Sequence, residues 1–283
     1  MLNPYGLVLE VVVLGLVALC GWHAWRQGPH VAWQFLAGVI FGVGLEWATI
    51  QQLHAYRYGR FALMLDGVPL AVGMAWGCIL YSARLFSDAS SLPQWARPVL
   101  DGLLALNIDL AMDAVAIRLG LWDWGGGLQA GYFGVPYPNF WAWFWVVFSF
   151  SFGLRLLTFR RGWAARWLGP FGAIVIGLVG VLGTNALMVF VVPAWGYAPT
   201  VAIMLVVMSA LVLSLRPRFS IRPADPIVFW VPFAFHAYFL LAGLVSGVIW
   251  RPPFLLGMSL TMLGLALYWH RASLRAFVRS ARR

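Results

Sequence analysis

The chain contains no lysine and little charge of either sign, since only 10% of its 283 residues are charged. Soluble domains carry about a quarter charged residues, so this composition argues against an ordinary soluble protein. The net charge of +10 comes from arginines that mostly lie between apolar runs. Such a distribution is typical of membrane loops and does not indicate a nucleic-acid partner.

Cysteine is also scarce. Cys20 and Cys78 each lie inside an apolar run and lack CxxC spacing, which argues against a disulfide framework or a cysteine-rich zinc site. The five histidines are scattered, and the chain has no phosphate loop, dinucleotide-binding glycine motif, zinc-protease motif or nucleophile elbow. The sequence therefore predicts no metal site and no cofactor.

Hydrophobic residues, by contrast, make up 62% of the chain, with a mean hydropathy of +0.83. A run of roughly 20 apolar residues spans a bilayer core. We predict an all-α, polytopic transmembrane helical bundle that forms a single membrane domain over residues 1–283, with about nine spans, or eight if the short last run does not cross. The expected spans are 5–25, 31–53, 62–83, 98–118, 139–158, 168–192, 197–215, 227–249 and 253–270.

The arginines predict the orientation of this bundle. The loops on the side of the N-terminus hold only Arg57, Arg60, Arg118 and Arg251, whereas the opposite loops and the C-terminal tail hold most of the others. Arginine-rich loops face the cytoplasm. We expect a multi-pass protein of the bacterial inner membrane, with its N-terminus outside and a cytoplasmic loop at 216–226 before a C-terminal helix pair.

This topology gathers five of the nine acids towards the outer face. Asp109 and Asp113 are four residues apart on one helix. Their side chains therefore lie on the same helix face, with Cβ atoms about 5–6 Å apart. Acids inside a membrane face the bundle interior and usually have a function, and a close pair in an apolar setting provides an acid beside a base. The alternative is a structural pair bonded to Asn107 or Arg118. The five acids are Glu46, Asp66, Asp109, Asp113 and Asp123.

Three further residues have two interpretations each. Glu46, in GVGLEWATIQQL, is either a third acid of the cluster or a buried hydrogen-bond anchor between helices. Asp66, in MLDGVPL, either approaches the site or forms an Asp-Gly turn, which the following proline favours. Arg57, in LHAYRYG, either pairs with an acid such as Asp123 or anchors the chain at the interface, as is more common.

Aromatic residues follow the acid pair closely. Most of these rings are expected to form an interfacial belt or to pack between helices. Others would present a ring face to a cation, worth about 2 kcal/mol when desolvated. The rings are Trp122, Trp124, Tyr132, Phe133, Tyr137, Phe140, Trp141, Trp143 and Trp145.

The order of these segments resembles a known family. Glu46 precedes YRYG, LDGVPLAVGMAW at 65–76, DLAMDAVAIRLGLWDWGGG at 109–127 and GYFGVPYPNFWAW at 131–143. This series is similar to the membrane carotenoid biosynthesis proteins of the CruF type, which include carotenoid 1,2-hydratases and bisanhydrobacterioruberin hydratases. The resemblance covers residues 40–155, which would form the catalytic core.

The resemblance implies a cofactor-independent hydro-lyase. Such enzymes add water to the terminal C1–C2 double bond of an acyclic, lycopene- or γ-carotene-like carotenoid. The carotenoid would enter the site from the lipid bilayer. The resemblance also implies contacts with other carotenoid enzymes. Asp109 and Asp113 would be acid and base in either order, assisted by Glu46. The candidates for contact with this apolar carotenoid or polyisoprenoid are Trp122, Trp124, Tyr132, Phe133, Asn139, Trp141, Tyr58, Asp123, Asp66 and Arg57.

Two other classes of function use the same residues. A cyclase or isomerase would begin with the same protonation and quench the cation by ring closure or proton loss. A proton-coupled transporter or a membrane scaffold would use the acids to relay protons or to hold helices together. Transporters often contain inverted repeats, and the sequence has no long internal repeat.

Overall fold

The computed structural model describes residues 2–53, 56–159, 162–219 and 225–280. The expected loop at 216–226 and the expected cytoplasmic residues Arg160, Arg161, Arg222, Arg282 and Arg283 lie wholly or partly outside these ranges. The elements in chain order are α1 (Pro4–Gln27), α2 (Pro29–Ala48), η1 (Thr49–Leu53), β1 (Arg57–Tyr58), β2 (Met64–Leu65), β3 (Val68–Pro69), α3 (Leu70–Asp88), α4 (Arg97–Arg118), β4 (Trp122–Asp123), α5 (Tyr137–Thr158), α6 (Trp163–Trp167), α7 (Gly169–Phe190), η2 (Ala194–Gly196), α8 (Tyr197–Ser214), α9 (Ile227–Ser246), η3 (Val248–Trp250) and α10 (Phe254–Ser280).

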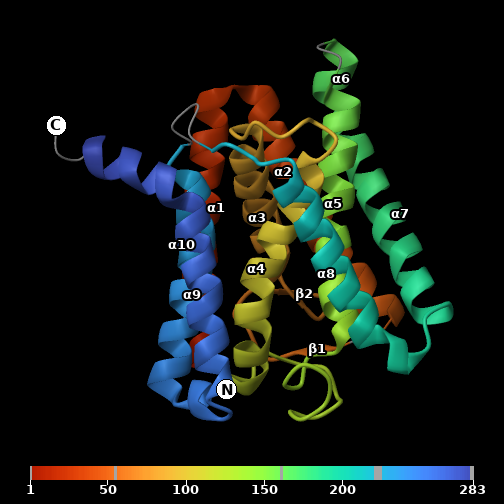
Figure 1. Ribbon diagram of the computed structural model, residues 1–283, viewed down its shortest axis with the longest axis vertical. Helices are drawn as coiled ribbons and strands as arrows, with labels where there is room; N and C mark the ends of the chain where they lie inside the picture. The colour runs from red at the N-terminus through yellow and green to blue at the C-terminus, as the bar shows by residue number, and fades with distance from the viewer. Residues whose placement is uncertain (1, 54–55, 160–161, 220–224, 281–283) are drawn as a thin grey trace.

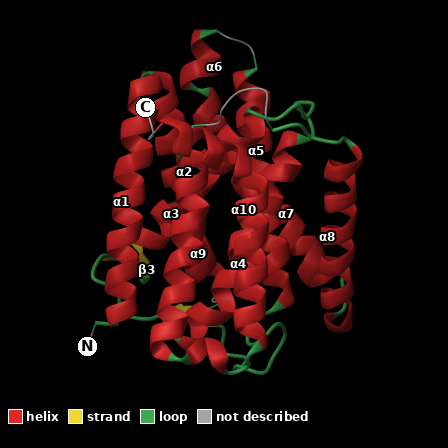
Figure 2. Ribbon diagram, turned by 60° about the vertical axis from the view of Figure 1, so that its left-hand side comes forward, coloured by secondary structure: helices red, strands yellow, loops and turns green. Residues whose placement is uncertain are grey.

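The long helices form one bundle, with the short strands at the end that holds the N-terminus (Figure 1). Seven described helices are long and apolar enough to cross a membrane: α1, α2, α3, α5, α7, α8 and α9. Helix α3 is central, because 72% of the residues in its 18-residue apolar stretch are buried, against 22% in those of α7 and α8. The outer position of α8 is visible in Figure 2. Exposed apolar side chains such as Phe171, Val179 and Val206 suit a lipid environment.

The helices differ from the expected spans in two ways. The third expected span, 62–83, was wrong at its start: residues 64–69 form a hairpin of β2 and β3, and α3 begins only at Leu70. Asp66 and Gly67 both have positive φ, as an Asp-Gly hairpin turn requires. Helix α4 forms where expected, whereas α10 continues from Phe254 to Ser280, beyond the expected end at 270, and neither is among the seven described helices that are long and apolar enough to cross a membrane.

Glycines bring α2 and α3 into close contact. Gly38 and Gly42 on α2 face Gly73 and Gly77 on α3, and a Cβ atom at Gly42 would lie 2.2 Å from the Gly73 carbonyl oxygen. Pairs of small residues four apart allow membrane helices to approach at their backbones. This contact sets the position of Glu46, which lies one turn beyond Gly42.

A two-stranded antiparallel sheet covers one end of the bundle. It pairs Arg57 with Asp123 and Tyr58 with Trp122, and Gly59 lies against the chain, because a Cβ atom there would be 2.4 Å from the Gly120 carbonyl oxygen. Side chains alternate between the two faces of a strand. The sheet therefore directs one set of side chains into the bundle and the other set outward.

Candidate functional site

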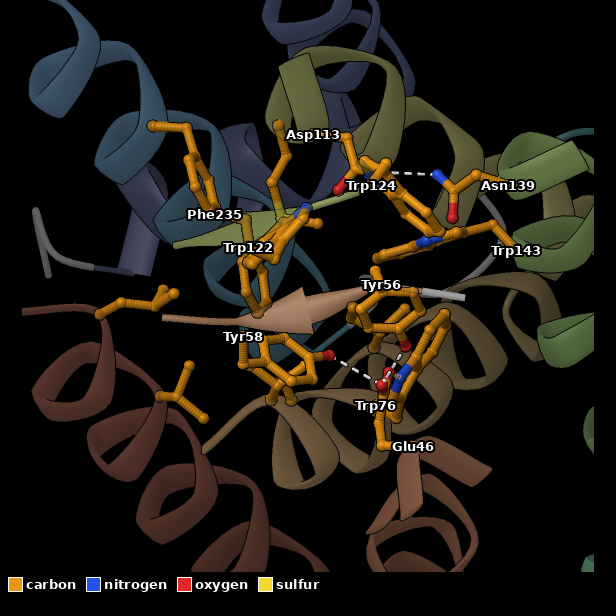
Figure 3. A pocket seen from close by; sticks show the side chains of 17 residues that line it. Glu46, Tyr56, Tyr58, Trp76, Asp113, Trp122, Trp124, Asn139, Trp143 and Phe235 are labelled. Atoms are coloured by element: carbon orange, nitrogen blue, oxygen red, sulfur yellow. Dashed lines mark hydrogen bonds between the residues drawn. The ribbon is translucent and has the colours of Figure 1, made fainter. Parts of the chain in front are cut away.

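Glu46 is buried and accepts three hydrogen bonds from aromatic side chains. The Trp76 indole Nε1 donates to Oε1 at 2.7 Å, and the Tyr58 hydroxyl donates to Oε2 at 2.7 Å. The Tyr56 hydroxyl also donates to Oε2, and Figure 3 shows the three donors around the carboxyl group. Such a set of donors stabilises an ionised carboxylate.

The two tyrosines remain donors over a wide range of pH. Burial, and then the nearby Glu46 carboxylate, raise the pKa of Tyr56 and of Tyr58 well above the usual value. The ordinary value for tyrosine is already about 10. Both phenols are therefore neutral in physiological conditions.

Asp109 and Asp113 converge on one amide group. The Asn139 Nδ2 atom donates to Asp113 Oδ2 at 2.7 Å and to Asp109 Oδ2 at 3.1 Å. The two acids are 0% and 2% exposed, and no described residue hydrogen-bonds Asp109 Oδ1. Two buried carboxyl groups that share an amide, and that pair with no cation among the described residues, avoid a double negative charge by keeping a proton.

The expected structural partners of this pair have other roles. Asn107 instead contacts the His236 ring and the Met262 carbonyl. Arg118 donates to the carbonyls of Ala114, Phe133, Leu128 and Arg251. Arg118 thus fastens the chain between α4 and α5 to the end of α4, and neither partner expected from the sequence contacts the acids.

Asp113 and Glu46 line the same cavity, which has a volume of about 60 Å³. A water molecule needs roughly 10–15 Å³ of such space, so there is room for a few. No arginine or histidine is among the described lining residues. The lining residues are Leu9, Val13, Glu46, Tyr56, Tyr58, Val72, Ala75, Trp76, Ile79, Met112, Asp113, Trp122, Trp124, Asn139, Trp143, Phe235 and Phe239.

The β1–β4 sheet explains which of the predicted residues reach this cavity. Tyr58, Trp122 and Trp124 line it (Figure 3). The residues that alternate with them, Arg57 and Asp123, are exposed. They lie opposite each other in the ladder, and the Asp123 carboxylate accepts a hydrogen bond from the Gly125 backbone. Both were expected near the substrate, and the sheet turns both away from the cavity.

Of the remaining predicted contact residues, Asn139 lines the cavity, whereas Asp66, Tyr132, Phe133 and Trp141 lie outside its lining. Asp66 forms the hairpin turn and accepts from the Trp47 indole at 2.9 Å. The Tyr132 hydroxyl donates to the Leu110 carbonyl, and the Tyr132 ring packs edge-on against Phe133. The Trp141 indole donates to the Thr184 carbonyl and so ties α5 to α7. Among the described residues, these contacts join the hairpin turn, the loop before α5 and helices α5 and α7 to their neighbours.

Several lining residues were not among the predicted site residues. Trp76 and Trp143 pack with their ring centroids 4.2 Å apart, and Phe235 and Phe239 of α9 close another side. Two features of the sequence could have indicated these residues. The Gly73 and Gly77 spacing indicates a close helix contact beside Trp76, and the alternation of Tyr56 with Tyr58 indicates a strand that directs both rings to one side. The phenylalanines of α9 have no such signal, since they lie far outside residues 40–155 in an apolar helix.

The described residues contain no group of three or more histidine, cysteine, aspartate or glutamate side chains arranged to hold a metal ion. Cys20 and Cys78 are buried and free. No protein-family model, curated protein or solved structure matches the chain. The site must therefore be interpreted from its own geometry.

Proposed function

We propose that the protein is a membrane hydratase that adds water to the terminal C1–C2 double bond of an acyclic carotenoid, as the resemblance of residues 40–155 implies. The observation that carries the proposal is the Asp109–Asn139–Asp113 cluster beside a small cavity walled by aromatic rings. This arrangement supplies a proton donor, a place for water and ring faces for a cation.

The two aspartates have different roles in this proposal. Asp113 lines the cavity, whereas Asp109 does not. Asp113 therefore transfers its proton to the alkene carbon C2, which leaves a tertiary cation at C1. Asp109 is a positioning residue that acts through Asn139. Water then forms a bond to C1 and releases a proton to the Asp113 carboxylate, so that the enzyme returns to its starting state.

Glu46 has a third role. Its carboxylate accepts from Tyr56, Tyr58 and Trp76, which favours the charged form. A fixed negative charge beside aromatic rings stabilises a positive charge that develops in the reaction. Glu46 is thus the anion that faces the carbocation, while the aspartates handle the proton.

The same cavity bears on the alternative reactions. A cyclase or isomerase must keep water from the cation, whereas this cavity has room for water beside Asp113. We therefore favour hydration over ring closure.

We further propose that α4 and α10 cross the membrane as well, giving nine spans, and that the N-terminus is outside, in a bacterial inner membrane. The arginine distribution supports this orientation.

The test is to express the protein in cells that make lycopene and to analyse the pigments by mass spectrometry. A product heavier by one water supports the proposal. An isomer of lycopene identifies a cyclase or isomerase instead. Asp109→Asn and Asp113→Asn should each abolish the product while the protein still inserts into the membrane; full activity in both variants contradicts the assigned roles.

A further inference from the structure

A second cavity lies between α2, α5 and α7. It has a volume of about 240 Å³, several times that of the acid cavity. Its walls are mainly apolar, and Val189 at its edge is 56% exposed. The lining residues are Leu45, Glu46, Thr49, Tyr56, Trp76, Trp124, Pro136, Pro138, Asn139, Ala142, Trp143, Val146, Val181, Asn185, Met188 and Val189. We call this cavity the lateral groove.

The lateral groove adjoins the acid cavity through a shared wall. The residues that line both are Glu46, Tyr56, Trp76, Trp124, Asn139 and Trp143. The wall therefore contains the Glu46 carboxylate and the amide that holds the aspartates, together with four aromatic rings. A molecule in the groove would therefore lie beside Glu46 and Asn139, whereas Asp113 lines only the acid cavity.

One polar side chain in the groove has no partner. Asn185 lies in the apolar helix α7, and no described residue hydrogen-bonds its amide group. Thr49, by contrast, donates to the Leu45 carbonyl of its own helix. Polar residues in membrane helices normally find partners or face a functional cavity. An unpartnered amide in an apolar groove indicates a visiting ligand that carries a polar group.

We propose that the lateral groove holds the hydrocarbon chain of a linear polyisoprenoid and directs its terminal double bond past the shared wall into the acid cavity, where Asp113 and a water molecule meet it. The inference rests on the proposed function and assigns the hydrocarbon chain to one cavity and the reacting end with its water to the other. The larger apolar cavity suits the chain, because burial of its surface provides the binding energy. Asn185 hydrogen-bonds the new hydroxyl group as the hydrated end leaves.

A blocked groove provides the first test. Ala142→Phe fills the groove from α5, and Val189→Trp narrows it from its exposed edge. Each has a matched control on an exposed site outside the lining: Ala186→Phe and Val191→Trp. Lycopene retained by the purified protein should fall by at least about tenfold in the blocked variants and stay at the wild-type level in the controls. Equal retention in all four variants overturns the proposal.

The Asn185→Leu variant provides the second test. It should retain lycopene normally but bind the hydrated product roughly fivefold less tightly, the effect of one hydrogen bond. An unchanged affinity for the product removes Asn185 from the proposal. Extraction of bound lipids provides a further outcome: if the groove retains phospholipid and excludes lycopene, its occupant is a lipid chain and the proposal is wrong.

Retention and hydration are measured separately, which distinguishes the two proposals. If lycopene binds in a groove-dependent manner but gains no water, the hydratase function fails and the groove assignment stands. If the blocked variants hydrate lycopene at the wild-type rate, the groove assignment fails and the hydratase function stands. If the wild-type protein neither retains nor hydrates lycopene, both are contradicted for linear carotenoids.

Discussion

Helix α4 carries two groups of buried acids, Asp101 near its start and the Asp109–Asp113 pair nearer its other end, and their surroundings differ. Near its start, Asp101 accepts a hydrogen bond from Arg155 at 2.6 Å and another from Ser151. Arg155 also pairs with Asp88 at 3.1 Å. Nearer the other end, Asp109 and Asp113 share the Asn139 amide, and neither pairs with an arginine in the part of the chain that the structure describes. One end contains matched ions, and the other contains acids without a cation.

In the proposed function, this difference separates a structural cluster from a reactive one. A buried ion pair holds its charges fixed and leaves no proton to give. Acids without a cationic partner retain a proton, and a cavity beside them gives a substrate access to it. The sequence placed Asp101 and Asp109 in the same helix, and only their neighbours on α3 and α5 distinguish them.

The largest effect is expected at the reactive end. Asp113→Asn removes the transferable proton but keeps the shape and the hydrogen bond to Asn139. Product formation should fall by roughly 10²–10⁴-fold, the usual contribution of general acid–base catalysis. The melting temperature in detergent should stay close to that of the wild type. A large loss of stability with retained activity would make the cluster structural.

The opposite pattern is expected at the matched end. Arg155→Met leaves Asp101 buried without its cation, which should lower the free energy of unfolding by about 3–5 kcal/mol. Adding Asp101→Leu to this variant should recover most of the lost stability, because no buried charge then remains unpaired. Thermal melts of the single and double variants measure the effect. The surviving folded protein should hydrate its substrate at the normal rate.

A smaller effect is expected where α2 meets α3. Gly42→Ala places a methyl group 2.2 Å from the Gly73 carbonyl, so the helices must separate and Trp76 must shift relative to Glu46. We expect a loss of roughly 1–3 kcal/mol in stability and a lower rate. Gly44→Ala is the matched control, because a methyl group there meets no atom within 4 Å. Equal behaviour of the two variants would show that the close contact does not position Glu46.

The smallest effect is expected at Asp123. This exposed acid lies next to two cavity-lining tryptophans in sequence, but the sheet turns it outward. Asp123→Asn keeps the acceptor for the Gly125 backbone and should change stability by less than about 0.5 kcal/mol. The hydration rate should not change. A strong loss of activity would show that Asp123 belongs to the site and that β4 directs its side chain towards the cavity.

The sequence allowed the helical membrane fold to be predicted, because long apolar runs leave few other structures possible. It also allowed Asp109, Asp113 and Glu46 to be expected inside the bundle, since an acid in an apolar run is rare and seldom faces lipid. It did not reveal the β1–β4 sheet, because two-residue strands give too little alternation to recognise. The pairing of Arg155 with Asp101 was missed as well, since residues 54 positions apart meet only through helix packing.

Isotope labelling of the product tests the central claim most directly. The purified protein is incubated with lycopene either in D₂O or in water enriched in ¹⁸O, beside the Asp113→Asn variant. The account predicts a product with deuterium on C2 and ¹⁸O on C1 from the wild type, and none from the variant. An unlabelled or isomeric product, or equal labelling by the variant, would contradict it.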